Sequence, residues 1–314
     1  MTAPRLDDVP LLPRPSRLRR LKEVPVLPSL ITLGNLFFGF LALAKVADAL
    51  RLAAPGAQFS AAVGYFELAA VLVFVAMVFD ALDGRVARMT GQTTPFGAQL
   101  DSMADMVTFG VVPAFLGKVL VDWHAQVDTN RLLPLQPKLF YSAAAVYVCC
   151  AALRLARFNV ETGSDEEDHR EFKGLPSPAA AAVVCSLIAL FCTRDDKTAE
   201  LGQLLFAPRH FDWIVMAMPV VLVVCGLLMV SRVPFPHALS ALMRKRRSLP
   251  MVAALLVLFV VAAVEWQLAL AFCSLGYVVF GVLLAIFRLV VRRRLDDDDD
   301  GDTDFPARSL PSRN

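Results

Sequence analysis

The chain contains apolar runs close to twenty residues long, and this feature limits its possible folds more than any other. A helix rises about 1.5 Å per residue, so that about twenty apolar residues cross the roughly 30 Å hydrocarbon core of a bilayer. Hydrophobic residues make up 57% of the 314 positions and the mean hydropathy is +0.57. A soluble domain of this size carries more charge and fewer unbroken apolar runs. The sequence therefore predicts an all-α, polytopic membrane protein.

The number of spans and their orientation follow from the apolar runs and the basic residues between them. Eight membrane spans are expected, over residues 28–50, 60–83, 98–120, 138–158, 177–193, 212–231, 250–265 and 268–290. Basic residues are concentrated before the first span, in every second loop and after the last span. Because basic loops remain on the cytoplasmic side, both termini are expected in the cytoplasm, with the protein in the cell membrane.

Four carboxylates lie inside the second and third expected spans, at Asp80, Asp83, Asp101 and Asp105. An ionisable residue inside a span costs a few kcal/mol, so each of them needs a partner or a function. Spacings of three and four residues place each pair on one helix face, and glycine and proline predict a turn between the two helices. The helix rise places Asp80 roughly 12 Å, Asp101 roughly 8 Å and Asp105 roughly 14 Å inside the membrane edge. All four are therefore expected to meet near the cytoplasmic interface.

This cluster indicates a metal site that also binds phosphate. Four carboxylates at one point cannot all remain ionised without cations, and Mg²⁺ or Mn²⁺ is expected because hard cations prefer oxygen ligands and bring phosphate groups with them. Gly84, Ala87 and Gly97 lie near the carboxylates, where a larger side chain would block a ligand. Arg88, one turn beyond Gly84, is suited to a phosphate oxygen.

The pattern of these residues resembles the signature of the CDP-alcohol phosphatidyltransferase family. That signature is Asp, two residues, Asp-Gly, two residues, Ala-Arg, eight residues, Gly, three residues, Asp, three residues, Asp. It is matched without departure by Asp80, Asp83, Gly84, Ala87, Arg88, Gly97, Asp101 and Asp105. The resemblance extends over the first six expected spans and implies a six-helix core, usually dimeric, with a site open to the cytosol and to lipid.

The resemblance also implies roles for the acids. Asp80, Asp83 and Asp101 would be ligands of two divalent metal ions, Mg²⁺ or Mn²⁺, which hold the diphosphate of a CDP-lipid. Asp105 would be both a metal ligand and the general base.

The remaining signature residues would bind the CDP-lipid. Gly84, Ala87 and Gly97 would leave room for its cytidine end, and Arg88 would contact a phosphate. CMP would leave as the hydroxyl of an acceptor alcohol attacks the β-phosphate.

Two further stretches resemble the phosphatidylserine synthase branch of this family, for which the lipid is CDP-diacylglycerol and the acceptor is L-serine. One is Gly-Asn-Leu-Phe-Phe-Gly at 34–39, and the other combines 154–159 with 172–178. Serine carries a carboxylate and an ammonium beside its hydroxyl, so its site needs a cation near the metals. The expected acceptor-binding residues are Arg154, Arg157, Asn159 and Lys173.

The chain is accordingly expected to divide into five parts. These are a basic cytosolic tail over 1–25, the catalytic core over 26–232, a basic cytosolic loop over 233–249, a two-helix hairpin over 250–291 and a disordered charged tail over 292–314. The hairpin is poor in charged residues and is expected to serve as scaffold or dimer contact.

The function expected is transfer of a phosphatidyl group from CDP-diacylglycerol to L-serine, giving phosphatidylserine and CMP. Another acceptor, glycerol 3-phosphate or inositol phosphate, stays open because it also needs cations nearby. A cation transporter stays open because intramembrane acids also mark ion pathways, although transporter sites favour the bilayer midplane and broken helices. Membrane lipids and a second copy of the chain are expected partners, and nucleic acid is not.

Overall fold

The structure is a computed structural model that describes residues 26–52, 59–92, 94–127, 137–162, 174–193, 212–233, 235 and 265–300. Its elements are α1 (Val26–Arg51), α2 (Phe59–Met89), α3 (Pro95–Asp105), the π-helical turn η3 (Met106–Val111), α4 (Val112–Val127), α5 (Pro137–Thr162), α6 (Ser177–Cys192), α8 (Asp212–Val230) and α11 (Trp266–Asp300). Over these ranges the chain contains helices and no strand, which confirms the all-α prediction.

Six helices in the described ranges are long and apolar enough to cross a membrane: α1, α2, the continuous helix from Pro95 to His124, α5, α8 and α11. The multi-pass architecture is therefore confirmed, whereas the count of eight spans is not. The expected span 177–193 corresponds to α6, which is apolar but has only 16 residues. The expected span 250–265 lies outside the described residues except for its last position.

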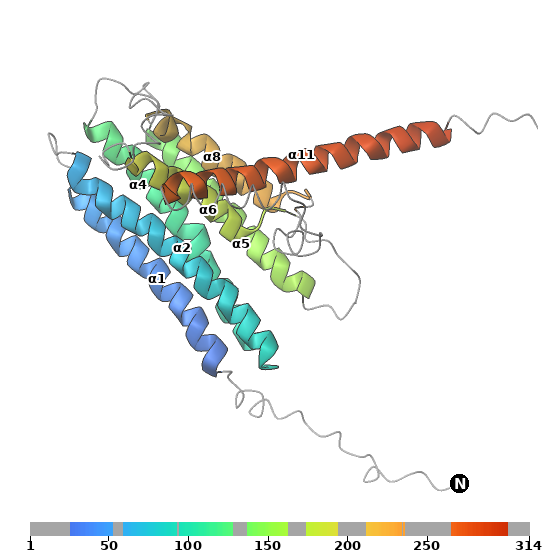
Figure 1. Ribbon diagram of the computed structural model, residues 1–314, viewed down its shortest axis with the longest axis horizontal. Helices are drawn as coiled ribbons and strands as arrows, with labels where there is room; N and C mark the ends of the chain where they lie inside the picture. The colour runs from blue at the N-terminus through green and yellow to red at the C-terminus, as the bar shows by residue number, and fades with distance from the viewer. Residues whose placement is uncertain are drawn as a thin grey trace, which may run out of the picture.

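Helix α6 is short because of where it lies in the bundle. It packs against α2, α4, α8 and α11 (Figure 1), and nearly all of its residues are buried, among them Ile188 and Phe191. A helix that is apolar all round is surrounded by protein. The length of α6 is therefore matched to its neighbours, with little contact left for lipid.

Helices α1 and α2 run side by side (Figure 1). The inner face of α1 carries small or polar buried residues three to four positions apart, such as Asn35, Gly39 and Ala42, whereas Leu33 and Phe40 are exposed. Small residues let two helix backbones approach closely in a membrane, and the large exposed residues provide a surface suited to lipid. The ring of Phe79 on α2, next to Asp80, packs against Gly34 and Phe38 of α1, so α1 lies beside the part of α2 that carries the acids.

The predicted turn between the two acid-bearing helices is present. Gly91 follows the end of α2 with a positive φ of 63°, a conformation that glycine adopts without steric cost. Thr94 caps α3, because its Oγ1 accepts a 3.1 Å hydrogen bond from the Gly97 N–H, and Pro95 occupies the first turn. The chain thus reverses direction within a few residues and returns α3 beside the end of α2.

Candidate active site

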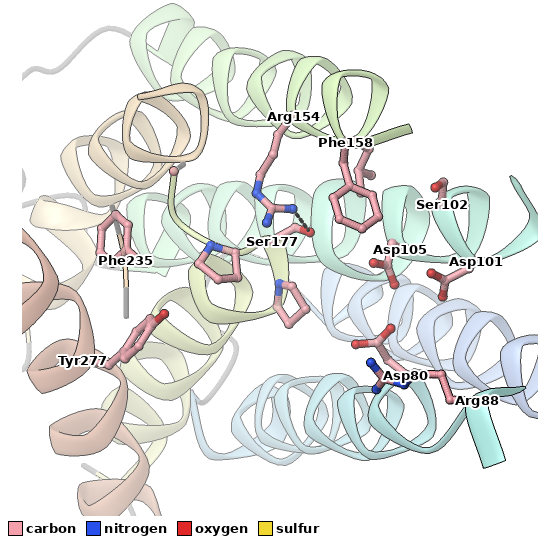
Figure 2. A pocket seen from close by; sticks show the side chains of 14 residues that line it. Asp80, Arg88, Asp101, Ser102, Asp105, Arg154, Phe158, Ser177, Phe235 and Tyr277 are labelled. Carbon is pink, nitrogen blue, oxygen red and sulfur yellow. Dashed lines mark hydrogen bonds between the residues drawn. The ribbon is translucent and has the colours of Figure 1, made fainter. Parts of the chain in front are cut away.

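Three of the four predicted carboxylates converge at one point. Asp80 comes from α2, whereas Asp101 and Asp105 come from α3 on the other side of the turn (Figure 2). One carboxylate oxygen of each residue lies within 4.8 Å of the other two. The turn between α2 and α3 therefore brings three carboxylates from two helices into one cluster.

Asp83 lies one turn further along α2, outside this cluster, and is 5% exposed. Its Oδ2 and the Oδ1 of Asp101 are buried without a hydrogen-bond partner among the described residues. Within the same part of the chain, none of the four carboxylates forms an ion pair with a basic side chain. Unpaired carboxylate oxygens at one point are the donors that Mg²⁺ and Mn²⁺ prefer. The residues present thus fit a divalent-metal site.

The helix that carries Asp105 changes its hydrogen-bond pattern directly after this residue. Met106–Val111 form the π-helical turn η3, and the N–H of Val112 donates to the carbonyl of Val107, five residues back. Such turns occur often at functional sites because the extra residue redirects the side chains around it. Here the π turn packs against α1 immediately beside the carboxylates.

The contact with α1 fixes the orientation of Asp105. The buried Asn35 side chain donates from Nδ2 to Asp105 Oδ1 at 3.2 Å, and Thr108 of the π turn donates from Oγ1 to the Asn35 carbonyl at 3.4 Å. A Cβ on Gly39 would overlap Oγ1 of Thr108. Glycine at this position therefore allows α1 to come close enough for the Asn35–Asp105 hydrogen bond to form.

Among the predicted CDP-lipid residues, Gly84 borders open space and Arg88 lines a cavity beside the carboxylate cluster. A Cβ built on Gly84 would find only the Nη2 of Arg88 within 4 Å, at 4.0 Å, apart from its own chain neighbours. Arg88 is exposed, and its guanidinium points toward Asp80 (Figure 2). Gly97 and Ala87 are half-buried. Arg88 lines the cavity described next, whereas the two glycines and the alanine do not.

A cavity of about 470 Å³ connects the carboxylates to residues from much later in the chain (Figure 2). The acidic end of the cavity is lined by Asp80, Arg88, Asp101, Ser102 and Asp105. The remaining lining residues are Arg154, Leu155, Phe158, Gly174, Pro176, Ser177, Pro178, Phe235 and Tyr277, and of these Figure 2 shows Phe235 and Tyr277 on the side opposite the carboxylates. A single cavity therefore contains a carboxylate cluster and two arginines.

Of the predicted acceptor-binding residues, the structure brings Arg154 into this cavity. Its Nη1 donates to Ser177 Oγ at 3.2 Å, whereas its buried Nε has no hydrogen-bond partner among the described residues. Asn159 does not line the cavity, but its Oδ1 accepts a 2.8 Å hydrogen bond from the hydroxyl of Ser102, which does. Arg157 is not among the lining residues, and Lys173 lies outside the described residues.

The segment before α6 places Ser177 beside Arg154. Gly174 has a φ of 99°, and its N–H donates to the Val233 carbonyl at 2.8 Å, while the Leu175 N–H donates to the Leu228 carbonyl at 3.0 Å. A side chain at Gly174 would meet the carbonyl oxygen of Met229. Glycine is therefore required here on two grounds, its backbone conformation and the closeness of α8.

Sequence reasoning assigned no role to several residues that contribute to the site, among them Asn35, Ser102, Ser177, Phe235 and Tyr277. For Asn35 a signal exists, because it is an amide in an apolar span flanked by glycines at 34 and 39. Ser177 also belongs to a stretch that the family resemblance singles out. For Tyr277 there is no local signal, because its neighbours on α11 are those of an ordinary membrane span.

The chain is similar in sequence to several enzymes of phospholipid synthesis. The chain is 30% identical over 210 residues to the CDP-diacylglycerol–serine O-phosphatidyltransferase of Helicobacter pylori, covering 67% of this chain and 71% of that protein. It is 31% identical over 216 residues to the Saccharomyces cerevisiae protein of the same name, covering 66% and 69%. It is 33% identical over 170 residues to the archaetidylserine synthase of Methanothermobacter thermautotrophicus, covering 54% and 60%.

A model of the CDP-alcohol phosphatidyltransferase family matches residues 25–225. The matched segment contains the three-carboxylate cluster, Asp83, Arg88 and Arg154, and it ends before Phe235 and Tyr277. From the carboxylate geometry and this match together, the chain belongs to the CDP-alcohol phosphatidyltransferase family.

Proposed function

We propose that this protein transfers the phosphatidyl group of CDP-diacylglycerol to L-serine, releasing CMP and forming phosphatidylserine. The relatives that bear the name CDP-diacylglycerol–serine O-phosphatidyltransferase support this proposal. Family membership and the arginines beside the carboxylates favour a transferase over a cation transporter.

Arg154 is the residue of the site that supports an anionic acceptor, and the names of the relatives favour serine among such acceptors. Arg154 lines the same cavity as the carboxylate cluster. Among the residues that the structure describes, it forms no ion pair with an acidic side chain, and its buried Nε has no hydrogen-bond partner. Arg154 is half-buried, and removing a cation from water, even in part, costs free energy unless an anion or hydrogen bonds compensate it. The carboxylate of serine provides such an anion, and a guanidinium binds a carboxylate with two parallel hydrogen bonds.

Asp105 is the proposed general base of the reaction. The serine hydroxyl oxygen forms a bond to the β-phosphorus, the bond from that phosphorus to the oxygen shared with the α-phosphate breaks, and CMP leaves with that oxygen. The hydroxyl proton passes to the Asp105 carboxylate, whose Oδ1 is oriented by Asn35. Arg88, at the acidic end of the cavity, is the proposed partner of a phosphate oxygen.

The proposed metal ligands are Asp80, Asp83, Asp101 and Asp105. Bound divalent ions would hold the diphosphate and stabilise the charge on the attacking and leaving oxygens. Asp80, Asp101 and Asp105 are already close enough to share an ion. Asp83, one turn away on α2, is the proposed ligand of a second ion.

We further propose that both termini face the cytoplasm and that the protein forms a homodimer. The alternation of basic loops supports the orientation. It would place the carboxylates, near the turn between α2 and α3, on the side where a nucleotide lipid and serine are available.

The test of the proposed function is release of CMP by the purified protein. It would be assayed with CDP-diacylglycerol, Mn²⁺ and, separately, L-serine, glycerol 3-phosphate and inositol phosphate, with chromatography of the lipid product. We expect serine-dependent CMP release and phosphatidylserine, and neither from an Asp105→Asn variant. CMP release that depends on one of the two phosphorylated acceptors and not on serine would overturn the choice of acceptor.

A further inference from the structure

The far wall of the cavity is built from chain that lies beyond the family match. That match ends at residue 225, whereas Phe235 and Tyr277 line the cavity together with Arg154. Tyr277 belongs to α11, which runs across the bundle at a steep angle to α1 and α2 (Figure 1). Figure 2 shows its ring at the end of the cavity opposite the carboxylates, with the hydroxyl directed inward.

Tyr277 is held in this position by specific contacts of α11. On the same face of the helix, Gln267 Nε2 donates to Glu67 Oε1 at 3.0 Å, and Ser274 and Ser186 share a hydrogen bond of 2.8 Å. These contacts, about two turns apart, tie α11 to α2 and α6.

A third contact follows two turns further along α11, at Gly281, where a Cβ would overlap the ring of Phe235. The ring of Phe235 also lies 6.0 Å from that of Tyr277, between centroids. Glycine at 281 therefore leaves the space into which Phe235 packs, and Phe235 in turn supports Tyr277. These contacts fix the position of Tyr277 in the wall of the cavity.

We propose that Tyr277 is a specificity-determining residue, which with Arg154 forms the pocket for the amino-acid part of the acceptor. This inference rests on the proposed function, serine being the acceptor. Arg154 and Tyr277 line the same cavity as the carboxylates, and in the view of Figure 2 the Arg154 guanidinium lies between the carboxylate cluster and the Tyr277 ring. A serine whose hydroxyl is at Asp105 then presents its carboxylate to Arg154 and its α-ammonium to the Tyr277 hydroxyl. That hydroxyl can both donate and accept a hydrogen bond.

The ring of Tyr277 also limits the length of the acceptor. L-Homoserine has the same charged groups as serine and one additional carbon before the hydroxyl, so it tests length without changing charge. We expect the wall to disfavour homoserine relative to serine, and shortening the side chain at 277 to lessen that discrimination.

The experiment compares Tyr277→Phe, Tyr277→Ala and the matched control Tyr141→Phe, whose tyrosine is 68% exposed on α5 and does not line this cavity. We expect Tyr277→Phe to raise the KM for serine about tenfold, because a hydrogen bond to a charged group is lost, with the KM for CDP-diacylglycerol within about twofold of the wild-type value. Tyr277→Ala should also raise the ratio of kcat/KM for homoserine to that for serine. Tyr141→Phe should change neither quantity.

A second pair of variants tests the support of Tyr277. Gly281→Ala displaces Phe235, whereas a Cβ on Gly276 of the same helix meets nothing within 4 Å. Gly281→Ala should therefore shift the serine KM in the direction of Tyr277→Ala, and Gly276→Ala should not.

Unchanged serine KM and unchanged homoserine ratio in both Tyr277 variants, with normal wild-type serine activity, would overturn this inference and leave the proposed function intact. A wild-type protein without serine activity would overturn both. If Tyr277→Ala does not fold, the serine KM of Tyr277→Phe tests the inference alone, because this variant preserves the packing of the ring.

Discussion

The Nδ2 of Asn35 donates a hydrogen bond of 3.2 Å to Oδ1 of Asp105, although the two residues are 70 positions apart in the chain. The contact ties α1 to the helix that carries two of the converging acids. One oxygen of Asp105 is thus held by an amide, while the residue has a carboxylate oxygen within 4.8 Å of oxygens of Asp80 and Asp101. A carboxylate that is held in this way keeps one orientation toward a substrate.

Replacing Asn35 is therefore expected to reduce catalysis more than donor binding. In Asn35→Ala the carboxylate of Asp105 loses a charge-assisted hydrogen bond, and we expect kcat to fall about tenfold or more, with the affinity for CDP-diacylglycerol little changed. Single-turnover CMP release and calorimetric binding of the donor measure the two effects. Ser29→Ala is the control, because Ser29 is also buried on α1 but its Oγ has no partner among the described residues. Equal losses in both variants would indicate general damage to α1.

We expect Asp105 and Asp80 to have different roles in the reaction. Asp105→Asn retains shape and some ligand capacity but cannot take a proton, so we expect nearly normal metal-dependent donor binding and a rate reduced roughly 10²–10⁴-fold. Asp80→Asn should instead weaken donor binding, because the metal that holds the diphosphate is lost. Calorimetry and single-turnover CMP release on each variant distinguish the two. If Asp105→Asn loses binding as severely as Asp80→Asn, Asp105 is chiefly a ligand and the proton leaves through another group.

The hairpin between α2 and α3 is the part of the site that sequence predicts best. Charged residues in apolar helices have few alternatives, and Gly91 and Pro95 are local signals for the turn between them. The π turn after Asp105 is different, because its hydrogen-bond pattern depends on packing against α1 and leaves no signature in residue types. The short length of α6 escapes prediction for a related reason, since burial by protein removes the need to match the thickness of lipid.

The contribution of α11 could not be predicted either. Arg154 and Tyr277 line one cavity only after α5 and α11 have taken their places in the bundle. Periodicity identifies the helix that carries Tyr277 but does not specify which of its faces turns toward the cavity.

Metal removal should abolish activity and reduce stability. Clustered carboxylates repel each other without cations, so we expect EDTA to stop CMP release and Mn²⁺ or Mg²⁺ to restore it. Binding of Mn²⁺ or Mg²⁺ to the folded state should also raise Tm, and Asp101→Asn should diminish this rise. Asp122→Asn is the control, because Asp122 is ion-paired with Lys118 at a different cavity. Full turnover in chelated buffer would contradict a metal-dependent reaction.

The orientation of the chain is tested by labelling. Single cysteines at Thr2, Ser312 and Gln126, in a background without the six native cysteines, would be treated in intact cells with a thiol reagent that does not cross membranes. We expect labelling at 126 only, with all three labelled after permeabilisation. Labelling of either terminus from outside would mean that the proposed topology is wrong.

The two arginines of α5 should differ in their effect on the acceptor, although sequence alone treats them alike. Arg154 lines the cavity, whereas Arg157, one turn later, does not. Loss of a charged contact to a carboxylate costs roughly 1.5–3 kcal/mol, or about ten- to over a hundredfold in affinity. We therefore expect Arg154→Ala to raise the KM for serine by at least tenfold, with a much smaller effect on the KM for CDP-diacylglycerol. Arg154→Lys should recover part of this loss, because an ammonium retains the charge but not the paired hydrogen bonds. Arg157→Ala should leave the ratio of the two KM values near that of the wild type. If Arg154→Ala raises both KM values equally, its guanidinium binds the diphosphate that the two steps share, and the serine carboxylate must be held elsewhere.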